Sequence, residues 1–336
     1  MTVRWGIAGI GRHADTYMVP AIAAVEGAQL VAVMSRDAGR GEDFARRHGA
    51  GRWYTRYEDL ASDPDVDAIL VTTPNAFHAE QVAIAAEHGK HVLCDKPLAL
   101  SRSEAVAAVE ACRRAGVRLG IDFQMRHTAW ASRVRTLLAE GAVGQVVAVE
   151  AEHASGRIGV QGWRTDPAMA GLGAVNNIGV HTYDLLRHLL GAEVVEVMAM
   201  FDRPPGDGVE LLAMVLLRFE GGAVAHVNAN QAVVHPRNDL AIYGTQGRIL
   251  ALGLNRHDQE GELRVVSGGV ERASAESTRD AYRRCIADFC HAVVEGREPL
   301  ADGLDGLRSV ELTEAIARSA REGELVGVVR SDLRPA

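Results

Sequence analysis

The 336-residue sequence predicts an α/β protein with two domains: an N-terminal doubly wound parallel sheet, and a C-terminal α+β domain with a large, open, mainly antiparallel sheet. Three observations predict this. Short apolar runs alternate with helix-like segments over the first third of the chain. A glycine-rich loop follows the first of those runs. Later runs are longer, with little helix between them. We place the boundary after residue 122, which gives domains 1–122 and 123–336.

The first domain is expected to alternate strands and helices. Continuous apolar runs are typical of parallel strands that are covered on both faces, and the connecting segments have helical periodicity. Ser101 and Glu104 form a capping-box pattern, and Pro20 should kink the first helix or mark its boundary. The strands are expected at 3–10, 29–35, 67–73, 91–95 and 118–123, and the helices at 13–26, 37–49, 79–89 and 101–116.

The second domain is expected to begin with a long helix and continue as a sheet. Residues 177–190 have the periodicity of one helix. The segments after it indicate strands joined by short connections, and the chain ends in two helices. The strands are expected at 193–201, 210–219, 223–233, 239–252 and 262–267, and the closing helices at 278–296 and 304–322.

Composition argues against several classes of function. The formal net charge of -8 and the scattered basic residues are unlike a nucleic-acid-binding surface. No apolar run is long enough to cross a membrane, and the N-terminus has no signal-peptide pattern, so we expect a cytoplasmic protein. Four cysteines without a CxxC pair are expected to be reduced and buried: Cys94, Cys112, Cys285 and Cys290.

The glycine loop predicts dinucleotide binding. The first strand runs into Gly9-Ile10-Gly11-Arg12-His13-Ala14, a GxGxxA variant of the dinucleotide fingerprint. Gly9 allows the tight turn, Gly11 lets the backbone approach a pyrophosphate, and Ala14 lets the helix pack against the strand. Free N–H groups at the start of that helix suit phosphate groups. The first domain is therefore expected to be a Rossmann domain.

The end of the second strand favours NADP(H) over NAD(H). NAD-selective sites usually carry an acidic residue at this tip, where it holds the ribose hydroxyl. Here the tip offers Ser35 and Arg36, with Arg40 one turn further on, and these donors suit a 2′-phosphate. Asp37 lies past the tip, where it can cap the following helix.

Four segments in fixed order resemble one known family. They are GIAGIGRHA, VTTPNAFHAEQ, GKHVLCDKPLAL and GLGAVNNIGVHTYD, and the resemblance to the glucose-fructose oxidoreductase / inositol dehydrogenase / rhizopine-catabolism (Gfo/Idh/MocA) family spans essentially the whole chain. It implies reversible hydride transfer between NAD(P) and a carbon of a sugar or polyol. It also implies an N-terminal Rossmann domain and a C-terminal domain whose open sheet mediates oligomerisation.

The resemblance also implies roles for individual residues. The family's lysine and histidine match Lys96 and His181. A second cofactor-binding segment and a Trp-Arg pair that reaches the cofactor also match. These further positions are Thr73, Pro74, Asn75, His78, Trp163 and Arg164.

The Asp95-Lys96-Pro97 segment follows a predicted parallel strand, at the edge where such sheets bind ligands. The ammonium group of Lys96 can hydrogen-bond the reacting oxygen and stabilise its alkoxide character. Asp95 stands where the family usually has Glu, and it could contact the nicotinamide carboxamide. Pro97 fixes the chain there, through a cis or a trans bond. His181 would exchange the hydroxyl proton, because the pKa of histidine lies near neutrality.

Asn177 departs from the family, which commonly has Asp at this position. On a helix Asn177, His181 and Asp184 share one face. Asparagine can donate and accept hydrogen bonds but cannot take up a proton. The expected consequence is a different substrate, weaker oxidation at neutral pH, or loss of activity. Asp184 could assist His181 instead.

Further candidates for the substrate site are polar residues of the second domain. Arg126 follows the last strand of the first domain, where it could either bind substrate or form a structural salt bridge. The others are His153, Arg157, Gln161 and Tyr183. His181 and Asp184 resemble part of a metal site, but no further ligand converges at a recognisable spacing, so no metal is expected.

The leading hypothesis is therefore an NADP(H)-dependent oxidoreductase acting on a sugar or polyol. The alternative within enzymes is an NAD-dependent dehydrogenase of an inositol, another polyol or a glycoside. A third hypothesis is a dinucleotide-binding regulator without turnover, which Asn177 favours and the presence of Lys96 and His181 disfavours. We expect a homo-oligomer, either a dimer or a tetramer, that associates through the C-terminal sheet, and no nucleic-acid or membrane partner.

Overall fold

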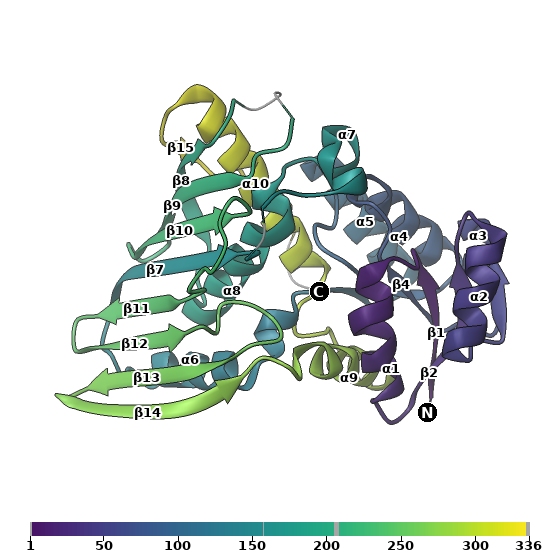
Figure 1. Cartoon of the computed structure of the whole chain (residues 1–336), viewed down its shortest axis with the longest axis horizontal. Helices are drawn as coiled ribbons and strands as arrows, with labels where there is room; N and C mark the ends of the chain where they lie inside the picture. The colour runs from purple at the N-terminus through teal and green to yellow at the C-terminus, as the bar shows by residue number, and fades with distance from the viewer. Residues whose placement is uncertain (1, 157, 205–207, 334–336) are drawn as a thin grey trace. The chain divides into compact units, whose positions relative to one another are not determined.

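The computed structural model describes residues 2–156, 158–204 and 208–333, which form two compact units (Figure 1). The first comprises residues 2–122, 282–310 and 331–333, and the second the described parts of 123–281 together with 311–330. The expected boundary after residue 122 coincides with a boundary between these units. Residues 282–310 group with the first unit, not with the second domain as expected, because the apolar side of α9 (Ala281–Glu295) packs into the first core.

The described part of the first unit contains a six-stranded sheet in which every neighbouring pair is parallel. The strand order is β3-β2-β1-β4-β5-β6, so the direction of winding reverses between β1 and β4. Ligands of doubly wound sheets bind at this switch point, beyond the carboxyl ends of the strands. The strands are β1 (Val3–Ala8), β2 (Ala28–Met34), β3 (Arg52–Tyr54), β4 (Ala68–Val71), β5 (His91–Cys94) and β6 (Leu119–Ile121).

The helices of the first unit confirm most of the sequence expectations. The predicted first helix divides into a π-helical segment, η1 (Ala14–Met18), and α1 (Val19–Ala23), whose first turn contains Pro20. Pro20 fits there because N–H groups in a first turn have no intrahelical partner. The Ser101–Glu104 capping box is present. The other helices before β6 are α2 (Ala38–His48), α3 (Tyr57–Ala61), η2 (Asn75–Phe77), α4 (His78–Glu87) and α5 (Arg102–Ala115).

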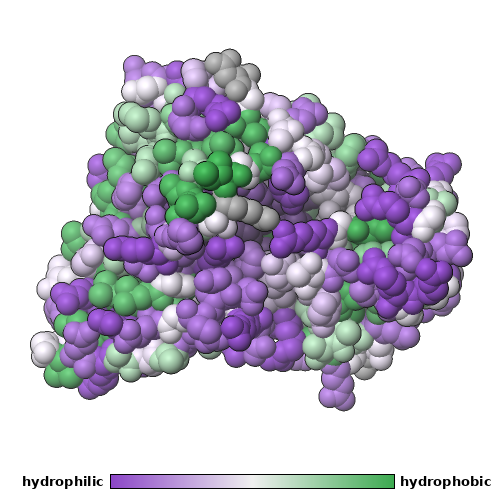
Figure 2. All heavy atoms as spheres, in the orientation of Figure 1, coloured by the Kyte–Doolittle hydropathy of each residue, from purple (hydrophilic) through white to green (hydrophobic). Residues whose placement is uncertain are grey.

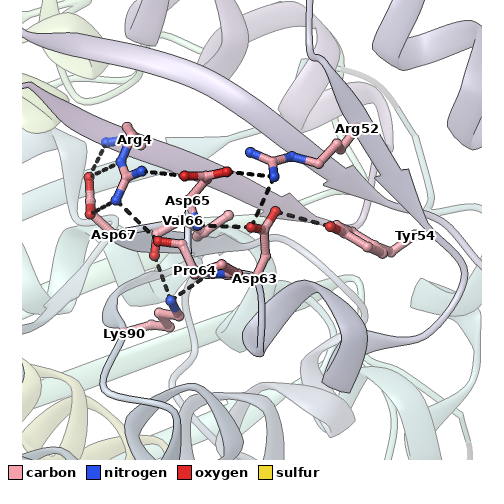
Figure 3. Close-up of polar contacts among 9 residues, drawn as sticks. All are labelled: Arg4, Arg52, Tyr54, Asp63, Pro64, Asp65, Val66, Asp67 and Lys90. Atoms are coloured by element: carbon pink, nitrogen blue, oxygen red, sulfur yellow. Dashed lines mark hydrogen bonds and ion pairs between the residues drawn. The ribbon is translucent and has the colours of Figure 1, made fainter.

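A polar network ties the amino ends of these strands together (Figure 3). The guanidinium group of Arg4 on β1 donates two hydrogen bonds to Asp67, which precedes β4, at 3.0 and 2.8 Å. The ammonium group of Lys90 donates to the carbonyl oxygens of Asp63 and Val66, at 2.7 Å each. This network lies at the sheet edge opposite the carboxyl ends, so it stabilises the fold and leaves the other edge to ligands.

The described part of the second unit contains a nine-stranded sheet. Its strand order is β14-β13-β12-β11-β7-β10-β9-β8-β15, and the β7–β10 pair is parallel while the other pairs are antiparallel. This confirms the expected open, mainly antiparallel sheet. The strands are β7 (Val146–Ala154), β8 (Val194–Phe201), β9 (Leu212–Phe219), β10 (Val224–Asn230), β11 (Leu240–Gly244), β12 (Gly247–Leu252), β13 (Glu260–Ser267), β14 (Val270–Ser277) and β15 (Val326–Gly327).

Helices cover one face of this sheet and enclose the second core (Figure 1). The expected helix from 177 begins earlier, as the π-helical η5 (Val175–Gly179), and continues as α8 (Val180–Leu190). Inward side chains of β9 and β10 pack against α6 (Ala129–Ala139) and α8. The remaining helices are η3 (Gln124–His127), η4 (Gly162–Thr165), α7 (Pro167–Ala170) and α10 (Gly303–Glu322), the last of which spans both units.

The outward sides of β8 and β9 carry apolar residues. Met200 and Leu216 are 72% and 47% exposed, and register pairs Met200 with Met214 and Leu216 with Met198. These four residues form one cross-strand cluster, which we call the outer methionine patch. Figure 2 shows hydrophobic side chains gathered in the part of the second unit where Figure 1 draws β8, β9 and β10.

The cysteines and the helices can be compared with the expectations from composition. All four cysteine thiols are buried and free, as expected. Among the described residues, no helix combines the length and the apolar character that a membrane crossing needs.

Candidate active site

The glycine loop has the geometry that its sequence predicts. Gly9 follows β1 with φ of +92°, and a Cβ atom there would lie 2.7 Å from backbone atoms of Thr72 and Thr73. Thr72 holds the turn, because its hydroxyl group donates to the carbonyl oxygens of Ala8 and Gly9 at 3.1 and 2.5 Å. At Gly11 the same Cβ would meet nothing within 4 Å. The loop is therefore closed behind Gly9 and open beside Gly11.

This loop fits a dinucleotide. The space beside Gly11 allows a pyrophosphate to approach the backbone, and the loop leads directly into η1, whose first N–H groups suit phosphate oxygens. Arg12 is exposed, while Ile10 is buried in the hydrophobic core of the first unit. Together these features give the first unit the phosphate cradle of a Rossmann domain.

The end of β2 presents polar groups to the same sheet edge. Ser35 is buried, and its hydroxyl oxygen accepts a hydrogen bond from the backbone N–H of Asp37. The Asp37 carboxylate caps α2 by accepting from the backbone N–H of Arg40 at 3.0 Å, which confirms the capping role. Arg36 and Arg40 have exposed side chains. Asp37 is therefore engaged by its helix, and the two guanidinium groups remain accessible.

Lys96 lies beyond β5, within the segment Asp95-Lys96-Pro97. The Lys96–Pro97 peptide bond is cis, and a carboxylate oxygen of Asp95 accepts from the Lys96 backbone N–H at 2.8 Å. The chain contains 36 basic residues other than histidine, but lysine occurs only at positions 90 and 96. Each of these two lysines is 9% exposed. Lys90 serves the polar network at the opposite edge, so Lys96 is the lysine that stands at the ligand edge.

The segment after β4 supports the loop around Lys96. Thr73 is buried and donates to the side chain of Gln81 at 2.6 Å. His78 is fully buried, and its ring nitrogens lie 2.7 Å from the Pro97 carbonyl oxygen and 2.8 Å from the Thr73 carbonyl oxygen. His78 thereby joins two loops of the ligand edge. Pro74 and Asn75 lie in the turn between Thr73 and His78, and Asn75 is buried.

His13, next in the glycine loop, is paired with a carboxylate that the sequence reasoning missed. Its Nε2 atom lies 3.0 Å from Oδ2 of Asp122, which directly follows β6 and is 1% exposed. Burial lowers the pKa of His13, but Asp95 and Asp122 outweigh it, and the pKa is raised overall. Burial raises the pKa of Asp122, and His13 opposes part of that rise.

In the second unit, Asn177 and His181 stand out by their exposure. Over residues 173–189 these two alone keep partly exposed side chains, and every other residue is buried. They are one helical turn apart across the junction of η5 and α8, so they share a face. Asn177 and His181 are therefore the groups that this segment offers to a ligand.

Asn177 belongs to a polar cluster. Its side-chain amide donates a short hydrogen bond to Oε1 of Gln231, and its oxygen accepts from Nε of Arg164 at 3.4 Å. The Arg164 guanidinium group lies over the ring of Trp163, 4.2 Å from its centroid. The structure thus brings together Trp163, Arg164 and Asn177, which the sequence nominated separately. Gln231, which directly follows β10, is an addition.

The start of η5 is held by Glu210. This carboxylate is almost fully buried and accepts from the backbone N–H groups of Gly173 and Val175, at 2.7 and 2.9 Å. Gly173 must be glycine, because a Cβ there would lie 2.0 Å from the Glu210 carbonyl oxygen. Burial raises the pKa of Glu210 despite these two donors. Glu210 therefore fixes the segment that carries Asn177 and His181.

His153, a further candidate for the substrate site, lies close to His181. The rings of His153 and His181 have centroids 5.7 Å apart. His153 is buried, and its Nδ1 atom lies 3.2 Å from the hydroxyl group of Thr182. Gln161 is exposed, and Arg157 lies outside the described residues.

Tyr183 and Arg126 were candidates for binding substrate, and both make contacts inside the protein instead. Tyr183 lies in the hydrophobic core of the second unit and is 1% exposed, so its expected contact with substrate is not supported. The helical period places it on the inward side of α8. Arg126 donates two hydrogen bonds to Asp184, and Arg187 donates a third. A structural salt bridge was one of the two alternatives that the sequence allowed for Arg126. The Asp184 carboxylate is paired with the guanidinium groups of Arg126 and Arg187.

The missed residues share one property: each lies just outside a regular element. Asp122 follows β6, Glu210 precedes β9, and Gln231 follows β10. A polar residue at a strand end is common in any sheet, so position alone could not distinguish them. Asp122 had the best signal, because it ends a parallel strand at the ligand edge, as Asp95 does.

Comparison with known proteins agrees with this architecture. The oxidoreductase family's NAD-binding Rossmann fold matches residues 3–123, and the GFO/IDH/MocA C-terminal domain matches residues 131–250. Of characterised relatives, 1,5-anhydro-D-fructose reductase of Ensifer adhaerens is 33% identical over 96% of this chain and 97% of its own. The scyllo-inositol 2-dehydrogenase (NAD(+)) of Bacillus subtilis is 27% identical over 96% and 95%.

A solved structure gives the same result. Aldose-aldose oxidoreductase from Caulobacter crescentus, in complex with glycerol, superposes with a TM-score of 0.90 at 29% identity and covers 97% of this chain and 100% of its own. The glycine cradle, the strand order and both domain matches lead to one conclusion. The chain belongs to the GFO/IDH/MocA family of oxidoreductases, with an NAD-binding Rossmann domain and the family's C-terminal domain.

Proposed function

We propose that this protein is an NADP(H)-dependent oxidoreductase that transfers a hydride to or from a sugar or sugar-derived carbonyl or hydroxyl group. One observation carries the proposal most directly: a scarce, nearly buried lysine follows β5 at the edge that also holds the glycine loop. The similarity to 1,5-anhydro-D-fructose reductase and to aldose-aldose oxidoreductase supports a sugar-like substrate.

Lys96 and His181 are proposed to have different roles in the reaction. A nicotinamide dinucleotide, when bound, supplies or accepts the hydride. Lys96 donates a hydrogen bond to the reacting oxygen and stabilises its negative charge as the carbonyl is reduced. His181 exchanges the proton of that oxygen as general acid in reduction and general base in oxidation. Burial of Lys96 strengthens its interaction, because water screens it less.

The groups proposed to hold the cofactor come mostly from the first unit. The glycine loop (Gly9 to His13) takes the pyrophosphate, and the segment Thr73 to Asn75, fixed by His78, lines the nicotinamide side with Asp95. Trp163 and Arg164 of the second unit contribute a stacked guanidinium group. Asn177, His181, His153 and Lys96 are the groups proposed to bind the substrate hydroxyls.

The preference for NADP(H) rests on the tip of β2. A 2′-phosphate needs cationic donors, and Arg36 and Arg40 are exposed there, while Asp37 is engaged as a helix cap. An NAD-linked polyol or glycoside dehydrogenase is the alternative, which the similarity to scyllo-inositol 2-dehydrogenase (NAD(+)) favours. Measured affinities for the two cofactors decide between them.

We further propose a homo-oligomer, a dimer or a tetramer, that associates through the outer methionine patch. A two-fold contact requires a self-complementary surface. The patch offers a flexible apolar centre with the ion pair of Arg218 and Glu196 beside it. We also propose a cytoplasmic location, which the four free cysteines support.

The decisive experiment measures binding and turnover together. Purified protein is titrated with NADPH, NADP⁺, NADH and NAD⁺, and the tighter pair is then assayed with a panel of sugars, ketosugars and polyols. We expect NADP(H) to bind more tightly, and Lys96→Met and His181→Gln to lower kcat at least about 100-fold. His226→Gln, at an exposed position on β10, is the matched histidine control.

Three outcomes would contradict the proposal in different ways. Tight cofactor binding without turnover on the whole panel would favour the regulator. Tighter binding of NAD(H) would favour the alternative dehydrogenase. Turnover that survives Lys96→Met would remove the proposed role of the lysine. Since Lys96 shares the chain with only one other lysine, amine-selective labelling can also report whether cofactor protects it, with Lys90 as the internal reference.

A further inference from the structure

The strongest unassigned feature of the first unit is a group of ionisable side chains around His13. Asp122 after β6 and Asp95 after β5 bring carboxylates to it, and the three side chains offer ligand atoms within 4.8 Å of one another. The ammonium group of Lys96 acts electrostatically on both His13 and Asp122. None of these four groups belongs to the polar network at the opposite edge.

Aromatic and sulfur-containing side chains enclose this group. The His13 ring packs against the rings of Tyr17 and Tyr282, with centroids 5.8 and 5.5 Å away, and those two rings stack at 5.0 Å. Cys285 is another titratable group near Asp122, and it lies on α9, as Tyr282 does. Burial raises the pKa of both Tyr282 and Cys285, so both remain neutral at ordinary pH.

With both carboxylates ionised, the charges of the group balance when His13 is protonated. Two carboxylates and one ammonium group leave one negative charge, and an imidazolium cancels it. Loss of that proton would leave an uncompensated carboxylate beside a loop built to receive phosphates. Such a charge is costly when buried and repels an anionic ligand.

The two ring nitrogens of His13 are not equivalent. Nε2 is held by Asp122 at 3.0 Å, and no hydrogen bond to Nδ1 occurs among the described residues. The side chain keeps 21% of its surface exposed, whereas that of Asp122 keeps 1%. With Nε2–H donating to Asp122, Nδ1 is an acceptor in the neutral ring and a donor in the protonated ring. While the ionised Asp122 carboxylate accepts from Nε2–H, only the protonated ring can offer Nδ1–H to an anionic oxygen.

We propose that Asp122 is a positioning residue, which holds the His13 ring so that its outer nitrogen hydrogen-bonds the bound dinucleotide and ties cofactor affinity to pH. The inference rests on dinucleotide binding by the glycine loop, and it adds a residue that no sequence motif marked. Asp95 and Asp122 raise the pKa of His13, which favours the protonated ring. Affinity should fall as pH rises through that pKa, because both the donor and the charge balance are lost.

The test measures the dissociation constant of NADPH from pH 6 to pH 9.5. In the unmodified protein we expect it to rise about ten-fold across this range, since one linked proton gives a ten-fold change for each pKa unit of difference between free and bound states. His13→Gln should remove this rise relative to the unmodified protein. Asp122→Asn, whose amide oxygen can still accept from Nε2–H, should move the midpoint to lower pH.

Matched variants distinguish a positioning role of Asp122 from a general loss of structure. His48 and Asp15 form another histidine–carboxylate pair in the same unit, at 2.7 Å, so His48→Gln is the control and should keep the unmodified profile. Ionisation of the cofactor's own phosphate affects every variant alike. The double variant His13→Gln/Asp122→Asn should bind no more weakly than His13→Gln alone, because Asp122 acts through His13. Thermal melting without ligand confirms that each variant is folded.

Several results would overturn the inference. A pH profile unchanged by His13→Gln and Asp122→Asn would remove the role of the pair while leaving cofactor binding intact. Additive losses in the double variant would show that Asp122 acts separately. If Zn²⁺ or Mn²⁺ alone bound tightly and Asp122→Asn abolished that binding, a metal ion and not a proton would balance these charges. Failure of the unmodified protein to bind any dinucleotide would instead refute the proposed function itself.

Discussion

Arg126 and Asp184 form a doubly hydrogen-bonded ion pair inside the second unit. Nε and Nη2 of the arginine donate to the two carboxylate oxygens at 2.7 and 2.6 Å, and the side chains are 5% and 1% exposed. Arg187 adds a contact to the same carboxylate at 3.3 Å and pairs with Glu193. The pair therefore connects η3, just past the boundary between the units, to α8, which carries His181.

Breaking this pair should destabilise the protein. Arg126→Met removes both hydrogen bonds that this arginine donates to the buried Asp184 carboxylate, and removal of one member of a buried pair costs about 3–5 kcal/mol. Urea unfolding at pH 7 measures the loss. Arg126→Met/Asp184→Leu should recover most of it, because no buried charge is then left unpaired at these positions.

The same variants test whether Arg126 also binds substrate. If its role is structural, the double variant should show a KM close to that of the unmodified protein. A stable double variant with a KM raised about ten-fold or more would assign Arg126 to the substrate site, since loss of a hydrogen bond to a charged group costs about 1.5–3 kcal/mol. A loss below about 1 kcal/mol in Arg126→Met would show that the pair contributes little, as exposed pairs do.

Cofactor preference should change at the tip of β2. Arg36→Ser and Arg40→Ser are each expected to weaken NADPH binding about ten-fold, because each removes a charge-assisted hydrogen bond to the 2′-phosphate. Binding of NADH, which lacks that phosphate, should change less than about two-fold. Fluorescence titration of both cofactors provides the comparison. Arg46→Ser, near the other end of α2, is the control, and an equal loss for NADPH and NADH would contradict the assignment.

Asn177 should limit oxidation at neutral pH. Asn177→Asp places a carboxylate one helical turn from His181, which should raise the basicity of the imidazole and favour proton removal from an alcohol. We expect kcat for oxidation at pH 7 to rise about ten-fold, within the range of general base effects, with a smaller change in reduction. Asn228→Asp on β10 is the control for added charge. Reduced activity in both directions would instead indicate that Asn177 must keep its amide contacts to Gln231 and Arg164.

The sequence predicted the elements whose local signals are strong. Five strands of the parallel sheet were predictable because both of their faces are buried, as β4 shows with four buried residues in succession. The short edge strand β3 was missed, because its three residues are only partly buried or exposed. Strands β7 and β14 were missed for opposite reasons. The outward face of β7 carries Glu150 and Glu152, and glutamate is uncommon in strands. Strand β14 lies at the edge of the sheet, and most of its residues are exposed.

The candidate site could be nominated from its motifs, but its supporting contacts could not. Gly9, Lys96 and His181 could be found because each lies in a segment with a recognisable local pattern. Asp122 and Gln231 meet His13 and Asn177 only through the fold, across 109 and 54 residues of chain. Arg126 and Asp184 were both noticed, yet their pairing depends on how η3 packs against α8, which periodicity does not specify.

The outer methionine patch should control association. Leu216→Glu introduces a charge at its centre, beside Met198 on the neighbouring strand, and burial of that charge in an interface between copies would be costly. We expect a predominantly monomeric variant with its thermal stability retained, because Leu216 faces outward from the sheet. Light scattering coupled to size-exclusion chromatography measures the mass. Val270→Glu, exposed on the edge strand β14, should keep the oligomeric state, and an unchanged mass in Leu216→Glu would refute association through this patch.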